Sequence, residues 1–194
     1  MSSAPRYFLP LLIIVALVQS AALFKMVYDK DRLLKTGHEI TMPVKPLDPR
    51  DLFRGDYVTL GYDVSTLNKS NTPEGRIAEL RAGSAAFVTL SPKADGGWTV
   101  KDVAPAFPTQ VAAGDIVLKG RVRNAWAQAG GSEKTVSVRY GIESYFVPEG
   151  TGRALENQVR DHKIEAIVAV GSDGTAALKG LVIDGERHVD PPLL

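Results

Sequence analysis

An uncharged run near the amino terminus, from Tyr7 to Phe24, constrains this chain more than any other feature of its sequence. A helix of that length is about 27 Å long, which is close to the roughly 30 Å hydrocarbon core of a bilayer. Lys25 follows the run, but its long apolar stem lets its charge reach the membrane surface, and three more apolar or aromatic residues come after it. We therefore predict a transmembrane helix that contacts the lipid bilayer through residues 7–28, within an anchor and stalk of residues 1–35.

Two other interpretations of this segment are a cleavable signal peptide and a buried core helix. Arg6, the apolar residues 8–18 and the small residues 20–22 follow one another in the order of a signal peptide. We favour an uncleaved anchor because apolar residues continue beyond the candidate cleavage site. A core helix is disfavoured because no polar face interrupts the run. Cleavage remains an open alternative, and the orientation is also open because basic residues lie on both sides of the segment.

The charge balance and the absence of cysteine exclude several classes of function. The chain has 23 basic and 22 acidic residues, a formal net charge of +1, which argues against a nucleic-acid partner bound through bulk charge. Without cysteine there can be no disulfide, thiolate nucleophile, cysteine-bound zinc or iron–sulfur cluster. The three histidines, His38, His162 and His188, are far apart in the sequence, so we expect neither a metal site nor another cofactor.

Residues 36–194 have the pattern of one β-rich domain. Short stretches of alternating apolar and polar residues recur between Gly, Pro, Asn and Asp, whereas helical periodicity is scarce. We predict a mostly β or α+β fold, an antiparallel barrel or sandwich of about eight short strands with one or two helices. A helical turn is expected near residues 72–81 and a helix near residues 151–162, and residues 171–174 can close a hairpin between the last two predicted strands. The strands are predicted at residues 38–46, 56–65, 84–91, 97–104, 115–126, 134–146, 163–170 and 175–183.

The most distinctive local pattern runs from Asp48 to Tyr62 and predicts a helical turn that leads into a strand. Asp48 can cap the turn, and Gly55 can adopt the positive φ that reverses the chain before the strand begins. The two-residue period of a strand then places Tyr57 on the outward face and the alternate residues in the core. The side chains predicted to be buried are Val58, Leu60, Tyr62 and Val64.

Residues 55–62 have the sequence G-D-Y-V-T-L-G-Y, and residues 48–54 before them and a second block at residues 140–156 complete a longer pattern. In these blocks, and in the apolar segment that precedes them, the chain resembles the GDYXXLXY domain family over roughly residues 35–185. The resemblance implies a bacterial protein with an amino-terminal anchor and a domain outside the cytoplasm. The family has no established biochemical activity. Relatives are often encoded with, or joined to, multi-pass membrane proteins, so the resemblance also implies a membrane partner.

We select ten residues of these blocks as the signature and as a candidate interaction site. Asp56, Tyr57, Glu143 and Tyr145 are expected on the outward faces of their strands, so pairing of the two strands would form an exposed aromatic and acidic patch. A structural role is the alternative, because Asp56 can accept hydrogen bonds from turn amides, and Arg139 and Glu143 can face each other along one strand. The ten residues are Arg54, Gly55, Asp56, Tyr57, Leu60, Tyr62, Tyr140, Glu143, Tyr145 and Glu149.

The expected function is that of a membrane-anchored binding or assembly module in the periplasm, attached to a bacterial inner membrane and acting with a multi-pass membrane protein. The chain lacks a G-x-S-x-G elbow, an H-E-x-x-H pair and a phosphate-binding loop, so we name no catalytic residue and do not favour an enzyme. The alternative is a membrane-bound protease of the signal-peptidase type. Residues 41–43, Thr-Met-Pro, are faintly similar to the nucleophile box of that family, with Thr41 in the place of its serine.

Overall fold

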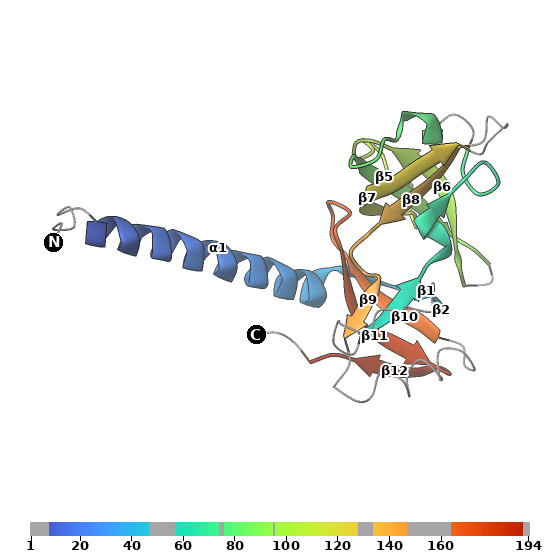
Figure 1. Cartoon of the computed structure of the whole chain (residues 1–194). Helices are drawn as coiled ribbons and strands as arrows, with labels where there is room; N and C mark the ends of the chain where they lie inside the picture. The colour runs from blue at the N-terminus through green and yellow to red at the C-terminus, as the bar shows by residue number, and fades with distance from the viewer. Residues whose placement is uncertain are drawn as a thin grey trace.

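The structure is a computed structural model that describes residues 8–46, 57–73, 76–94, 96–127, 134–146 and 164–191. This part of the chain is mostly β, with antiparallel sheets and one long helix at its amino terminus, which confirms the predicted fold class (Figure 1). All eight predicted strand regions contain observed strands, and two short strands, β4 (Thr66–Leu67) and β12 (Glu186–Val189), lie outside them. The predicted turn at residues 48–55 and the predicted helix at residues 151–162 fall outside the described residues.

The helix α1 (Phe8–Thr36) projects from the β-rich body as a rod, and its carboxyl-terminal end meets the body (Figure 1). Every residue from Phe8 to Lys30 is exposed, and Asp31 is the first buried residue along the helix. The apolar side chains before Asp31 are therefore not covered by any part of the body that the structure describes. By its length and composition, α1 could cross a membrane.

Four antiparallel strands form the sheet on which α1 ends, in the order β1 (His38–Pro43), β10 (Ile164–Val170), β11 (Ala176–Ile183) and β12. A single residue, Gly37, separates α1 from β1, so no flexible linker joins the helix to the sheet. The predicted hairpin connects β10 and β11. In its turn, the Gly171 N–H donates to the Thr175 carbonyl oxygen and the Gly174 N–H donates to that of Gly171.

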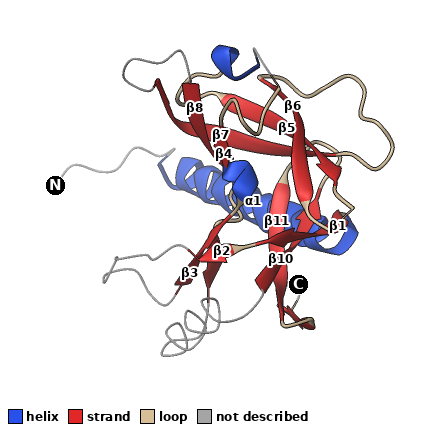
Figure 2. Cartoon of the chain, turned by 90° about the vertical axis from the view of Figure 1, so that its right-hand side faces the viewer, coloured by secondary structure: helices blue, strands red, loops and turns tan. Residues whose placement is uncertain are grey.

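A second sheet, of five antiparallel strands, forms the other half of the body (Figure 2), in the order β4, β8 (Lys134–Arg139), β7 (Ile116–Ala127), β5 (Ala85–Pro92) and β6 (Trp98–Ala104). The tip of the β10–β11 hairpin reaches this sheet, where the Lys119 N–H donates to the Gly174 carbonyl oxygen at 2.8 Å. Gly174 has a φ of 83°, and a Cβ there would lie 3.2 Å from the Lys119 nitrogen. The close approach of the hairpin to the second sheet therefore requires glycine.

A small third sheet contains the signature strand, in the order β2 (Lys45–Pro46), β3 (Tyr57–Gly61) and β9 (Ser144–Phe146). The 3-10 helix η1 (Asp63–Ser65) follows β3, and η2 (Arg76–Glu79) occupies the region of the predicted turn at residues 72–81. One hydrophobic core joins all three sheets, with buried side chains from strands such as β1, β3, β5, β7, β8, β10 and β11. The third sheet is thus packed into the body rather than appended to it.

The predicted strand at residues 134–146 is interrupted, which corrects the sequence-based expectation. Gly141 lies between β8 and β9 and has a φ of 85°, in the left-handed region that favours glycine. Because the chain turns here, Arg139 and Glu143 do not share one strand face as predicted. They form an ion pair across the turn, with Arg139 Nε 3.7 Å from Glu143 Oε2.

Candidate functional site

The signature strand packs alternate side chains into the core, as its two-residue period predicts. Val58, Leu60, Tyr62 and Val64 are all buried, and Leu60 has no exposed surface. The Leu60 N–H also donates to the Glu143 carbonyl oxygen at 2.8 Å, which joins the signature to the second sequence block. Leu60 and Tyr62, two named positions of the signature, are therefore core residues.

Two buried tyrosines connect the two blocks in both directions. The Tyr62 hydroxyl donates to the Ile142 carbonyl oxygen at 2.8 Å, and the Tyr140 hydroxyl donates to the Val64 carbonyl oxygen at 2.7 Å. We name these two bonds the tyrosine clasp. Burial raises the pKa of both phenols above the ordinary value, and the nearby charge of Glu143 raises it further. Both hydroxyls consequently remain protonated donors.

Glu143 belongs to the turn between β8 and β9, not to an exposed acidic patch, so its predicted position was wrong. Its carboxylate accepts hydrogen bonds from the backbone N–H groups of Tyr140 and Gly141 and pairs with Arg139. Only 17% of its side chain is exposed. The carboxylate accepts hydrogen bonds from amides that the left-handed turn leaves without a strand partner. Its role is thus structural, but it acts within the turn and not along a strand face shared with Arg139, as the sequence predicted.

Tyr145 was also predicted on the outward face, and the register of the sheet places it on the other one. Tyr145 lies directly opposite Val58, so both side chains point to the same face, and Tyr145 packs against the core. Its hydroxyl donates to the Asp190 carboxylate at 2.8 Å. Burial raises the pKa of Tyr145 to about 12, with further contributions from the bond to Asp190 and from its charge. The turn at Gly141 resets the alternation on which the prediction relied.

The strand pairing that the predicted patch requires is present, because β3 and β9 are neighbours. Phe146 lies opposite Tyr57, at a position that faces away from the core, and 78% of Phe146 is exposed. The exposed aromatic residue of β9 is therefore Phe146 rather than Tyr145. The side chain of Tyr57 lies outside the described part of the structure, as do the selected residues Arg54, Gly55, Asp56 and Glu149.

A pocket of about 510 Å³ lies between the signature strand and the five-stranded sheet. Three of the predicted site residues, Leu60, Tyr62 and Glu143, contribute to its wall. Other wall residues come from β2, η1, β4, β7 and β8, so the pocket exists only where the small sheet meets the large one. We name it the signature pocket; its charged and hydroxyl-bearing side chains are Lys45, Thr59, Tyr62, Asp63, Ser65, Thr66, Arg123, Ser137, Arg139, Glu143 and Ser144.

Three charged residues of the signature pocket were missed by the sequence analysis. Lys45, Asp63 and Arg123 belong to separate elements, and no local motif relates them. Lys45 Nζ lies 2.5 Å from Asp63 Oδ1, in an exposed ion pair. The sequence signal near Arg123 is a break in the two-residue period of β7. A regular strand would place Val122 and Asn124 on the same face, but Val122 and Ala125 are the residues that face the core.

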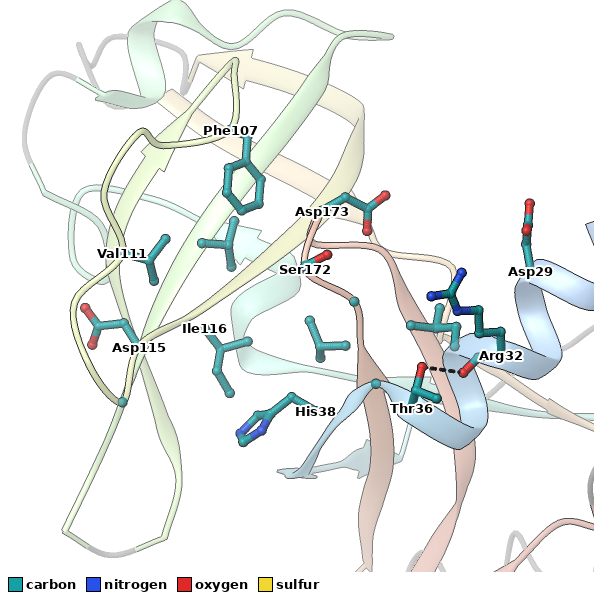
Figure 3. Close-up of a pocket in the computed structure, with 16 residues that line it drawn as sticks. Asp29, Arg32, Thr36, His38, Phe107, Val111, Asp115, Ile116, Ser172 and Asp173 are labelled. Carbon is teal, nitrogen blue, oxygen red and sulfur yellow. Dashed lines mark hydrogen bonds between the residues drawn. The ribbon is translucent and has the colours of Figure 1, made fainter.

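A second hollow, of about 900 Å³, lies at the base of α1 (Figure 3). The end of α1 with Arg32 forms one wall, and the hairpin tip with Asp173 lies next to it. The loop before β7 faces them with Phe107 and Val111, which are 40% and 41% exposed. We name this hollow the basal groove; its wall mixes charged and apolar side chains.

Thr41, the residue of the protease alternative, lies in the middle of β1 opposite Ile167 of β10. Its backbone carbonyl oxygen accepts a hydrogen bond from the Trp98 indole N–H at 2.8 Å. Within the described ranges, no group of three His, Asp or Glu side chains is arranged to hold a metal ion.

Comparison with known families gives one match. The model of the family described as GDYXXLXY protein matches residues 19–181, which is most of the chain. Neither a curated protein nor a solved structure matches significantly. The matched range includes both sequence blocks, the tyrosine clasp and the signature pocket.

Proposed function

We propose, from the premise that the chain belongs to the GDYXXLXY family, that it is a membrane-anchored binding or assembly module. In this proposal α1 crosses a bacterial inner membrane once, the β-rich body lies in the periplasm, and the body acts with a multi-pass membrane protein. The observation that carries the proposal is the geometry of α1: one helix runs without a break from an apolar, uncovered segment to a docked end on the body.

The uncovered segment of α1 supports the membrane anchor energetically. Exposed apolar surface costs about 25 cal/mol per Å² in water, and a continuous apolar helix of this length is too large for an ordinary soluble surface. A bilayer would remove that cost and would match the length of residues 8–28. Lys25 and Asp29, an ion pair one turn apart, are placed where the helix would leave the lipid.

The docked end of α1 supports a fixed position of the body next to the lipid. Residues 28–36 of the helix span about 12 Å, so the body would begin within about 12 Å of the bilayer. Leu33 packs closely here, since a Cβ on Gly37 or on Gly171 would lie 3.1 or 3.2 Å from its Cδ1 atom. Asp31 is buried at this junction and pairs with Lys35 at 2.7 Å. A body held in this way presents the basal groove to neighbouring membrane proteins.

Photo-crosslinking in native membranes tests the partner. A crosslinking amino acid replaces Val111 in the basal groove, and a control replaces Lys93 in the β5–β6 turn, on the far side of the body from α1 (Figure 1). We expect an adduct with a multi-pass membrane protein from position 111 and little or none from position 93. No adduct at position 111, or equal labelling at both positions, would contradict the proposed partner.

Reporter fusions test the orientation separately. Alkaline phosphatase fused after Leu194 is active only in the periplasm, and a fluorescent protein that folds poorly there serves as the matched control. We expect an active phosphatase and a dark fluorescent fusion, both sedimenting with membranes after carbonate washing. Fluorescence without phosphatase activity would place the body in the cytoplasm.

A further inference from the structure

Three β-bulges in the body each place a basic residue outside the regular ladder. The register shifts leave Lys101 of β6, Arg123 of β7 and Lys179 of β11 without a directly opposed residue on the neighbouring strand. Bulges change the direction of a side chain and are common beside functional sites. Three basic residues at equivalent irregularities allow a direct comparison of what each side chain does.

Two of the three bulge residues have carboxylate partners. Lys101 Nζ lies 2.6 Å from Asp115 Oδ2, and Lys179 Nζ lies 2.9 Å from Glu39 Oε2. The side chain of Arg123 forms no hydrogen bond or ion pair with any residue that the structure describes. Its bulge therefore cannot be explained by an ion pair within this part of the protein. The side chain of Arg123 instead lines the signature pocket.

The remaining charges of the signature pocket are already balanced. Asp63 pairs with Lys45, and Glu143 is occupied by two backbone N–H groups and by Arg139. Arg139 contacts Glu143 through Nε at 3.7 Å, and a guanidinium has five N–H donors, so other donors of Arg139 stay available. With both carboxylates neutralised, the pocket has the excess positive charge of Arg123.

Ser65 gives an independent indication of a ligand. Its hydroxyl oxygen is buried and has no hydrogen-bond partner, and it is the one buried side-chain polar atom in that condition within the described residues. Ser65 lines the same pocket as Arg123. A buried hydroxyl without a partner costs free energy comparable to a lost hydrogen bond. A ligand oxygen that accepts a hydrogen bond from this hydroxyl, once the side chain rotates into the pocket, would remove that cost.

We propose that the signature pocket binds one oxyanion group, a phosphate or a carboxylate, of a small ligand, with Arg123 as its anchoring cation and Ser65 as a hydroxyl donor. The volume of about 510 Å³ is within the usual range of roughly 300–1,000 Å³ for small-molecule sites. Planar guanidinium groups bind such oxyanions through paired hydrogen bonds, and Arg139 lies on the same wall as a second guanidinium.

Titration of the full-length chain with inorganic phosphate and with succinate tests this site. The protein is kept in dodecyl maltoside micelles, which contain no phosphate or carboxylate, and the arginine Nε–Hε NMR signals report binding. We expect at least one of the two anions to shift the Arg123 signal saturably. Arg123→Gln removes the Arg123 signal, so binding to this variant is followed through the Nε–Hε signal of Arg139, which lines the same pocket. Binding should weaken about tenfold or more, as the loss of a charged hydrogen bond predicts.

Arg121→Gln is the matched control, because it removes the same charge from an exposed residue of the same strand that does not line the pocket. Binding in this variant should change less than about twofold, as expected for a screened surface charge. Ser65→Ala should also weaken binding without lowering the melting temperature. Absence of saturable binding of both anions, or equal losses in the Arg123 and Arg121 variants, would overturn the proposal.

A second arm distinguishes a soluble ligand from a lipid headgroup. In nanodiscs of phosphatidylglycerol, a headgroup in the pocket would shift the Arg123 signal before any anion is added and would block the titration. A soluble ligand predicts an unshifted signal and an unchanged titration in the same nanodiscs. A pocket for a small anion would exist whether or not the basal groove contacts a membrane protein, so this test and the crosslinking test fail independently.

Discussion

Removing one hydroxyl of the tyrosine clasp measures how strongly the two sequence blocks hold each other. Tyr62→Phe keeps the ring in the core but leaves the Ile142 carbonyl oxygen buried without the donor that now lies 2.8 Å away. Loss of one partner of a buried hydrogen bond costs about 1–3 kcal/mol. For a domain of this size, each kcal/mol of lost unfolding free energy lowers the melting temperature by about 2–4 °C.

The assay is urea and thermal unfolding of the full-length protein in detergent micelles, followed by near-ultraviolet circular dichroism. Tyr145→Phe is the matched control, because its hydroxyl bonds to an exposed carboxylate of Asp190 and its loss should cost less than about 0.5 kcal/mol. Tyr140→Phe should resemble Tyr62→Phe, since its hydroxyl bonds to the buried Val64 carbonyl oxygen.

The double variant of the two clasp tyrosines shows whether the bonds act together. Both bonds connect the same two segments, so the losses of unfolding free energy in the two single variants should not add up to the loss in the double variant. A coupling energy of about 0.5 kcal/mol or more is expected. Equal stability of the Tyr62→Phe variant and the wild type would refute the clasp. A destabilisation by Tyr145→Phe as large as that by Tyr62→Phe would also refute it, because the effect would then not depend on burial.

Three other substitutions test the packing and the charges of the body. Leu60→Ala should lower the unfolding free energy by about 2–5 kcal/mol in urea denaturation, because it leaves a cavity beneath the signature strand; a loss below about 1 kcal/mol would contradict its burial. Gly180→Ala should prevent β12 from pairing with β11, since a Cβ there would lie 2.1 Å from the His188 carbonyl oxygen, and faster amide exchange across residues 186–189 would be its measure. Hydrogen bonds from Arg187 and then Lys179 hold the pKa of Glu39 below its ordinary value, so its contribution to stability is present above about pH 4.5 and is lost as the pH falls through the lowered pKa. The urea midpoints of wild type and Glu39→Gln should therefore converge on acidification, and a gap that widens would reverse the assigned sign.

The structure explains the roles of those signature residues that it describes. Leu60 fills the core, Tyr62 donates one bond of the clasp, and Tyr140 of the second block donates the other. The two clasp bonds join segments that are far apart in the sequence, residues 62–64 and residues 140–142. The signature pocket forms beside that joint, so the same residues that stabilise the body also shape the wall of a candidate binding site.

The amino-acid sequence by itself determined the features that depend on neighbours along the chain. The apolar run predicted α1, the alternation after Tyr57 predicted which residues of β3 are buried, and the turn residues at 171–174 predicted the β10–β11 hairpin. Each of these follows from a local period or a local backbone requirement. The family was also recognisable at this level, because its signature is a short contiguous pattern.

The tertiary structure alone decided the features that depend on register and on sheet contacts. The left-handed turn at Gly141 shifted Tyr145 to the core face and withdrew Glu143 into the turn, and no period counted along the strand could reveal that change. A bulge in β7 directed Arg123 toward residues from other sheets. A one-residue shift of register moves a side chain to the opposite face, so the position of a strand is readable from sequence while the surroundings of its side chains are not.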